Sequence, residues 1–248
     1  MPAVRVWAVE SDYDKDAVGN LARKLVDHAG RSEIAIWTAG KRAYNKVAKR
    51  LRKNPDALKV AVRAYLADSD SVIFVIDRDS QIALEARRQE AYSMVNQIER
   101  VVASKEFDGK VHLALAIEEL EAWLLIDCVG ICCYFAQSRY RKNCRERVVD
   151  NRDLSRLIRR NQKGKTELIV EAERGGAGAK EYLVKFSEAI LTTLNPRMRR
   201  DTVDRNKYRE ALAPELAKYV EMSKESLRRN QSLQRFCTLL LSVETKND

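Results

Sequence analysis

The run Ser71–Ile76 (SVIFVI) is the feature that most restricts how this chain can fold. After its first residue it contains only apolar side chains, most of them β-branched, and no polar residue alternates with them. A strand of this kind is covered on both faces, which is typical of a parallel sheet between two layers of helices. Three further apolar runs suit strands. The sequence therefore predicts four strands, at residues 4–9, 33–37, 71–76 and 111–117.

Segments with helical spacing of apolar residues separate the expected strands. Strands joined by helical crossovers form a parallel sheet, so the predicted fold class is α/β, with a Rossmann-like, mostly parallel four-stranded sheet flanked by helices. No further strand run follows residue 130. The sequence thus predicts an α/β domain at 1–138 and a basic helical region at 139–248. The expected helices are 17–28, 43–51, 57–66, 82–103, 118–127, 148–160, 179–194, 207–222 and 233–241.

The positive charge of the chain is concentrated in its second half. The formal net charge is +10, and residues 139–235 contain 25 Lys and Arg against 14 Asp and Glu. A localised basic surface attracts polyanions through phosphate neutralisation and counterion release, so nucleic acid is an expected partner. Two alternatives stay open: a solvated helix face, or pairing with acidic residues of the fold or of a protein partner. The predicted nucleic-acid-binding residues are Arg139, Arg141, Lys142, Arg145 and Arg147.

Cysteine content and hydropathy restrict where the chain is expected to work. The five cysteines are an odd number, at spacings that match no zinc site. This pattern predicts reduced, partly buried thiols in a cytoplasmic protein. No stretch approaches the ~18 consecutive apolar residues of a membrane span, so no membrane association is expected. The N-terminal residues run directly into the first strand and lack the pattern of a secretory signal.

Acidic side chains follow the first and third expected strands. Glu10 follows the first, and Asp77 and Asp79 follow the third. Because ligands bind beyond the carboxyl ends of parallel strands, we expect these three side chains to converge at one edge of the sheet. Asp77 and Asp79 are two residues apart, so in an extended segment they point to the same side and repel unless a cation lies between them. The alternative is that these acids cap the following helices.

The donor chemistry predicts Mg²⁺, or Mn²⁺ in its place. Hard carboxylate oxygens suit Mg²⁺, which keeps several waters and takes only one or two carboxylates from the protein. Glu10 is expected to complete the metal site or to act as general acid or base. Asp14, four residues later, is expected on the first turn of a helix as a further metal ligand. Glu118, Glu119 and Glu121, after the fourth strand, either complete the acidic edge or favour the N-terminus of their helix.

Glu10 and the motif Asp77-Arg78-Asp79 resemble the acidic residues of the Toprim superfamily. The chain looks closest to small Toprim-like proteins, related to the OLD-type nucleases, that are encoded beside ABC-type ATPases in prokaryotic defence loci. Those proteins have a first strand followed by Glu-Gly-x-x-Glu, similar to ESDYD at 10–14 here. They also contain an acidic-Leu-Glu-Ala-Trp-Leu-Leu segment, here 119–125, and a Ser-Leu-type stretch near the C-terminus, here 231–236. The similarity spans nearly the whole chain.

This resemblance implies a Toprim-like fold and Mg²⁺-dependent hydrolysis of phosphodiester bonds in DNA or RNA. Glu10 would move the proton, Asp77 and Asp79 would hold metal, and Asp14 would support a second ion. The resemblance further implies the effector of an anti-phage defence or toxin system that works with an ABC- or SMC-like ATPase. Whether the chain forms a homo-oligomer is left open.

Two positions depart from the family pattern and leave an alternative function open. Ser11 stands where the family has Gly, and Asp14 where it has Glu. The alternative is therefore a catalytically degenerate Toprim module that binds nucleic acid or an ATPase partner without cleaving. A receiver-like or nucleotide-binding α/β domain also has acidic strand ends, but the basic C-terminal region and segment 119–127 disfavour it.

Two further residues have expected positions or roles. Trp123 is expected to pack in the core. Lys180 is a candidate contact to a substrate phosphate.

Overall fold

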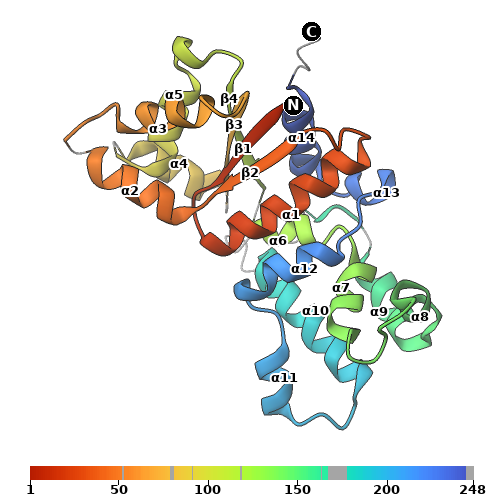
Figure 1. Cartoon of the computed structure of the whole chain (residues 1–248). Coiled ribbons are helices and arrows are strands. Elements are labelled where there is room, and N and C mark those ends of the chain that lie inside the picture. Colours follow the sequence, from red (N-terminus) through yellow and green to blue (C-terminus); the bar gives the residue numbers. More distant parts are fainter. Residues whose placement is uncertain are drawn as a thin grey trace.

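The computed structural model describes residues 1–51, 53–78, 81–90, 92–117, 119–162, 164–166 and 178–243 (Figure 1). Its centre is a four-stranded, all-parallel sheet flanked by helices, which confirms the predicted α/β, Rossmann-like fold class. Every strand lies within two residues of its expected bounds. The strands are β1 (Ala3–Ala8), β2 (Ala35–Ala39), β3 (Ser71–Asp77) and β4 (Val111–Ala116).

The strand order, β2-β1-β3-β4, brings the carboxyl ends of β1 and β3 side by side. From β1 the chain continues to β2 on one side, whereas from β3 it continues to β4 on the other side. In open parallel sheets, ligands bind where the connections diverge in this way. The residues that directly follow β1 and β3 therefore lie at the place where the topology favours a site.

Alternate residues of the strands pack against different helices, as the two-residue period of a strand requires. On one side, Val4 and Val6 of β1 share a hydrophobic core with α1 (Asp12–His28). On the other side, Trp7 shares a second core with residues of α2, α3 and α5. Residues Ser71–Ile76 of β3 are all buried, as the absence of polar alternation predicts. The remaining helices before β4 are α2 (Lys41–Leu51), α3 (Ala57–Leu66), α4 (Gln81–Gln89) and α5 (Met94–Val102).

All described elements after β4 are helical. In Figure 1, α7 to α11 lie below the sheet, while α14 returns to it and packs against β4 and α1. The core on the α1 side of the sheet continues without a break into these helices. The division into 1–138 and 139–248 stays a prediction. The helices are α6 (Leu120–Leu124), α7 (Cys128–Ala136), α8 (Cys144–Asp150), α9 (Arg152–Asn161), α10 (Ala179–Leu194), α11 (Arg200–Asn206), α12 (Ala213–Tyr219), α13 (Lys224–Leu227) and α14 (Gln231–Leu241).

Trp123 joins α6 to α14 and confirms the expectation that it is a core residue. Its ring is fully buried and stacks on Phe236, with 5.0 Å between the ring centroids. Its indole N–H donates a hydrogen bond of 2.8 Å to the Ser232 hydroxyl. Segments 119–125 and 231–236, far apart in the sequence, are therefore packed directly against each other.

Two of the expected helices are broken by residues that cap new helices. The expected helix 82–103 is wrong as one element, because Ser93 accepts a hydrogen bond from the backbone N–H of Asn96 and starts α5. The expected helix 148–160 is likewise divided at Asn151, whose side chain accepts from the N–H groups of Asp153 and Leu154. Short polar side chains offer the backbone these local partners, and they end helices that apolar periodicity alone would extend. The expected helix 207–222 is also shorter: it consists of a 3-10 turn, Glu210–Leu212, followed by α12.

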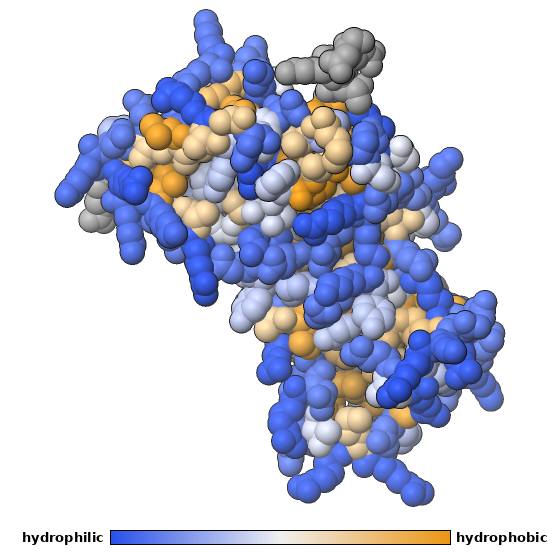
Figure 2. Space-filling view, in the orientation of Figure 1, coloured by the Kyte–Doolittle hydropathy of each residue, from blue (hydrophilic) through white to orange (hydrophobic). Residues whose placement is uncertain are grey.

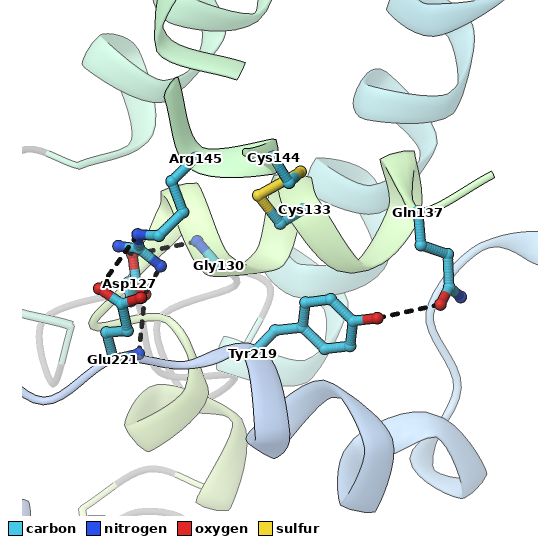
Figure 3. The surroundings of a disulfide bond; sticks show 8 residues. All are labelled: Asp127, Gly130, Cys133, Gln137, Cys144, Arg145, Tyr219 and Glu221. Carbon is cyan, nitrogen blue, oxygen red and sulfur yellow. Dashed lines mark hydrogen bonds and ion pairs between the residues drawn. A yellow bond between two sulfur atoms is a disulfide. The ribbon is translucent and has the colours of Figure 1, made fainter. Parts of the chain in front are cut away.

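A disulfide joins Cys133 of α7 to Cys144 of α8, so the expectation of reduced thiols is wrong for this pair (Figure 3). The chain reverses between the two helices, with Asn143 in the left-handed region at φ 51°. This reversal brings the two Cα atoms within 5.7 Å, a separation that spacing in the sequence does not reveal. Cys128, Cys132 and Cys237 are free thiols.

Loss of the disulfide is expected to destabilise the fold. A crosslink that closes a loop of this size removes freedom from the unfolded chain, and its loss costs about 2–3 kcal/mol. Cys144→Ser should therefore lower the urea midpoint, whereas Cys237→Ser, at a free thiol, should change it little. Denatured, unreduced protein should react with a thiol reagent at three of its five cysteines. Reaction at all five would contradict the crosslink.

Within the described ranges, none of the helices combines the length and the apolar character needed to cross a membrane.

Candidate functional site

Glu10 and Asp77 meet at the carboxyl ends of β1 and β3, as the sequence predicts. One carboxylate oxygen of Glu10 accepts a hydrogen bond of 3.1 Å from the backbone N–H of Asp77, the last residue of β3. The other oxygen accepts a hydrogen bond of 2.8 Å from Arg87 of α4. The Glu10 side chain is therefore held between two strands and a helix, with only 23% of its surface exposed. This contact brings two of the three predicted catalytic acids together.

Asp14 lies on the first turn of α1, where the sequence places it. Ser11 is the N-cap of that helix, and its hydroxyl accepts hydrogen bonds of 3.0 Å and 3.4 Å from the N–H groups of Tyr13 and Asp14. Burial raises the pKa of Asp14 from its ordinary 3.8 to about 6, and the negative charges of Glu210 and Glu10 add to the effect. Ser11 is thus a helix cap, and Asp14 can hold a proton near neutral pH.

Glu119 and Glu121 bring the start of α6 into the same acidic cluster. Glu119 accepts a hydrogen bond of 2.7 Å from the backbone N–H of Lys180, at the start of α10. Glu121 is buried and accepts a hydrogen bond of 2.8 Å from the Tyr208 hydroxyl. Burial raises the pKa of Glu121 to about 7, although the hydrogen bond from Tyr208 opposes this shift. Both glutamates therefore serve the local structure and also face the acidic edge.

The carboxyl group of Asp77 is also perturbed by its surroundings. Its pKa is raised well above the ordinary 3.8, first by loss of hydration and then by the negative charges of its neighbours, of which Glu10 and Asp14 have the largest effects. Glu121 and Glu119 act in the same direction. An anion in such surroundings favours either a bound proton or a nearby cation.

These side chains line one cavity of about 590 Å³, the acidic cavity. Three cationic residues, Lys41, Arg42 and Lys180, share its wall with the acids. Lys180 forms an ion pair with Glu210. The acidic residues that line the cavity are Glu10, Asp12, Asp14, Asp77, Glu119, Glu121 and Glu210.

Sequence reasoning missed Glu210 and Tyr208 and assigned no role to Lys41 and Arg42. Tyr208 and Glu210 precede α12 and have no motif or strand end beside them, so no signal in the sequence marks them. Lys41 and Arg42 follow β2, and the rule that strand ends face the site would have included them. Gly40, before them, is required for close approach, since a Cβ there would lie 2.5 Å from a carboxylate oxygen of Asp12.

The donor chemistry of the cavity fits a hard divalent cation. The candidate ligands are oxygen acceptors, and burial together with the charges of neighbouring acids raises the pKa of Asp14 and Asp77. As they stand, no three Asp, Glu, His or Cys side chains in the described ranges are grouped closely enough to hold one ion. The Glu10 carboxylate contacts the Asp77 backbone N–H, however, both residues line the cavity, and one or two protein carboxylates suffice for Mg²⁺. The predicted ligand Asp79 and the candidate Glu118 lie outside the described residues.

Two of the five predicted nucleic-acid-binding residues have partners within the fold. Arg145 forms ion pairs with Asp127, at 2.9 Å, and Glu221, at 3.1 Å, as Figure 3 shows. Arg139 donates a hydrogen bond of 2.7 Å to the backbone carbonyl of Leu194. These two contacts are those expected if the basic side chains serve the fold itself. Arg141, Lys142 and Arg147 are exposed.

The raised carboxyl pKa values predict that stability falls as the pH rises. Glu121 and Asp14 lose their protons near pH 4 when unfolded but near pH 6–7 when folded, so the folded state binds more protons between these limits. Their contribution is fully present below about pH 4 and is lost by about pH 7, at about 1–3 kcal/mol for each group.

Thermal unfolding between pH 5.5 and pH 8 measures this effect. Glu121→Gln, which mimics the protonated carboxyl, should flatten the decline in melting temperature. Glu225→Gln, at an exposed position of α13, should leave it unchanged. A decline that is identical in the Glu121→Gln variant would contradict the assignment.

Comparisons of the chain with models of protein families, with curated proteins and with solved structures give no match.

Proposed function

We propose that this chain is a metal-dependent nuclease that hydrolyses phosphodiester bonds of DNA or RNA. One observation supports this most: Glu10 and Asp77, from adjacent parallel strands, meet at the switch point of the sheet inside the acidic cavity. Buried capping acids would account for one carboxylate at each strand end, but they do not account for several carboxylates with raised pKa values that line one cavity. Of the motifs that resemble the Toprim superfamily, residues 10–14, Asp77, Glu119 and Glu121 line the same cavity.

Mg²⁺ or Mn²⁺ would be held by Asp77 and Glu10, with Asp14 and Asp79 as further ligands. When bound, such an ion neutralises charge on the scissile phosphate and lowers the pKa of an attacking water. Glu10, fixed by the Asp77 N–H and by Arg87, is placed to move a proton. Asp14, with its pKa of about 6, is a second group able to exchange a proton near neutral pH.

The cations of the cavity hold the substrate and balance the acids. Lys41 and Arg42 at the start of α2, and Lys180 at the start of α10, line the cavity together with the carboxylates. A phosphodiester is an anion that the acids alone repel, so these side chains orient its oxygens towards Glu10 and Asp77.

The alternative is a module that binds nucleic acid or an ATPase partner without cleaving it. The ion pair between Arg87 and Glu10 favours this alternative, because it occupies one oxygen of the proposed catalytic carboxylate. From the resemblance we also propose an ABC- or SMC-like ATPase as the partner, in a defence or toxin system.

Incubation of the purified protein with plasmid, single-stranded DNA and total RNA separates the two functions. The nuclease predicts cleavage with Mg²⁺ or Mn²⁺ and none with chelator. A protein that binds these substrates but leaves them intact under every metal condition, alone and with the proposed ATPase partner, supports the binding module.

A further inference from the structure

We propose that a groove along α2 binds single-stranded nucleic acid and leads it into the acidic cavity. This inference rests on the proposed function only in taking the acidic cavity as the place of cleavage. The α2 groove is a hollow of about 560 Å³ between α2, the end of β2 and Tyr65 of α3. It shares Asp12 and Arg42 with the acidic cavity, so the two hollows adjoin.

The wall formed by α2 is strongly cationic. Helix α2 (KRAYNKVAKRL) contains five basic residues and no acidic one, and all five are exposed. Arg42 pairs with Asp12, at 3.1 Å, but Lys46, Lys49 and Arg50 have no acidic partner within 4 Å in the described part of the chain. Residues three and four apart lie on one face of a helix. These three charges therefore form a row beside the groove, and Figure 2 shows hydrophilic side chains projecting from this part of the surface.

An exposed aromatic ring is linked to the α2 groove through Arg5 and Tyr65. Trp37 of β2 is 48% exposed, whereas Trp7 and Trp123 are fully buried. The Arg5 guanidinium carbon lies 5.1 Å from the centroid of the Trp37 ring and 4.8 Å from that of Tyr65, which lines the groove. Surfaces that bind single strands combine cations for the phosphates with aromatic rings for the bases. In a duplex the bases stack on each other and are not free to stack on a protein side chain. The exposed Trp37 ring therefore favours a single strand.

The α2 groove also lies where a substrate needs to lie. Figure 1 shows α2 beside the start of α1, at the carboxyl ends of the strands, and α8 far from them. In the predicted binding segment 139–147, two basic side chains already have partners within the fold. Arg145 pairs with Asp127, and Arg139 donates a hydrogen bond to the carbonyl of Leu194. The net charge of the second half predicted residues 139–147 as the binding surface. The place of α2 near the carboxyl ends of the strands, and its unpaired cations, favour α2 instead.

The first experiment measures binding of a labelled single-stranded oligonucleotide in chelator, so that cleavage plays no part. Replacing Lys46, Lys49 and Arg50 with Ala should weaken binding by about 10-fold or more and reduce the slope of log affinity against log salt by about 2, at ~0.7 for each phosphate contact. The matched control replaces Arg152, Arg156 and Arg160 of α9, which are equally exposed, and should change neither value. Melting curves verify that each variant folds.

The second experiment uses Trp37 as its own reporter. Because it is the exposed one of the three tryptophans, stacking of a base should quench emission in the wild type and not in Trp37→Phe. Trp37→Ala should weaken binding of a single strand by about 5- to 100-fold. A duplex of equal length and inorganic polyphosphate should compete for the cations without quenching.

Several results would overturn the inference. These are unchanged affinity in the α2 variant, quenching that persists in Trp37→Phe, or a larger loss when Arg141, Lys142 and Arg147 are replaced with Ala. The proposed function fails separately: a protein that binds through α2 but never cleaves refutes the nuclease alone, and one that cleaves with α2 neutralised refutes the groove alone.

Discussion

Asp77→Asn is expected to lower the rate of metal-dependent cleavage by roughly 10³-fold, because it removes a carboxylate that holds the ion and its contribution to transition-state stabilisation. The same change is expected to raise the melting temperature of the metal-free protein. Burial and the charges of Glu10 and Asp14 raise the pKa of Asp77, so its ionised form opposes folding. A neutral amide of the same shape removes that cost. Cleavage assays and melting curves in chelator measure the two effects.

Two further variants make this prediction specific. Glu10→Gln should lower cleavage by about 10²–10⁴-fold while its amide oxygen still accepts the hydrogen bond from the Asp77 N–H. Asp16→Asn, at an exposed position of α1 outside the acidic cavity, should leave cleavage unchanged. If Asp77→Asn cleaves normally, or melts at a lower temperature than the wild type in chelator, the role assigned to Asp77 is wrong.

Trp123→Ala is expected to destabilise the protein by about 3–5 kcal/mol, the usual cost of deleting a fully buried tryptophan. The change removes the ring that stacks on Phe236 and leaves a cavity between α6 and α14. It also loosens α6, which positions Glu119 and Glu121, so cleavage should fall as well. Urea unfolding gives the loss of free energy.

The hydrogen bond of Trp123 is tested separately from its packing. Ser232→Ala leaves the ring in place but deprives the buried indole N–H of its acceptor, which costs about 1–3 kcal/mol. Trp37→Phe, at the exposed tryptophan, serves as the control and should cost little. A loss below ~1 kcal/mol for Trp123→Ala would contradict the central position of this ring in the core, since buried aromatic deletions cost several times more.

Part of the candidate site follows from the sequence because it depends on local rules. Glu10 and Asp77 follow apolar strands directly, and the carboxyl ends of parallel strands meet at one edge of a sheet. Asp14 follows because a helix had to begin just after Glu10. Glu210 lines the same cavity, and Tyr208 donates a hydrogen bond to Glu121 in its wall, yet nothing near these two residues in the sequence marks their place.

Charge counting predicted a basic region but not what its side chains do. Arg145 belongs to the predicted basic region, yet in the fold it pairs with Asp127, a buried N-cap of α7, and with Glu221. The row on α2 is a small part of the total charge, but it has no acidic partner among the described residues. A net charge records only the excess of cations over anions, whereas binding depends on which cations remain unpaired.

The sequence by itself determined the class of this fold, the number and place of its strands, and the acids at their ends. These properties follow from burial and strand periodicity, which act over a few residues. The tertiary structure decided the order β2-β1-β3-β4, the disulfide between Cys133 and Cys144, and the convergence of three distant segments on one cavity. These features depend on the path of the whole chain, since they join groups that only packing brings within bonding distance.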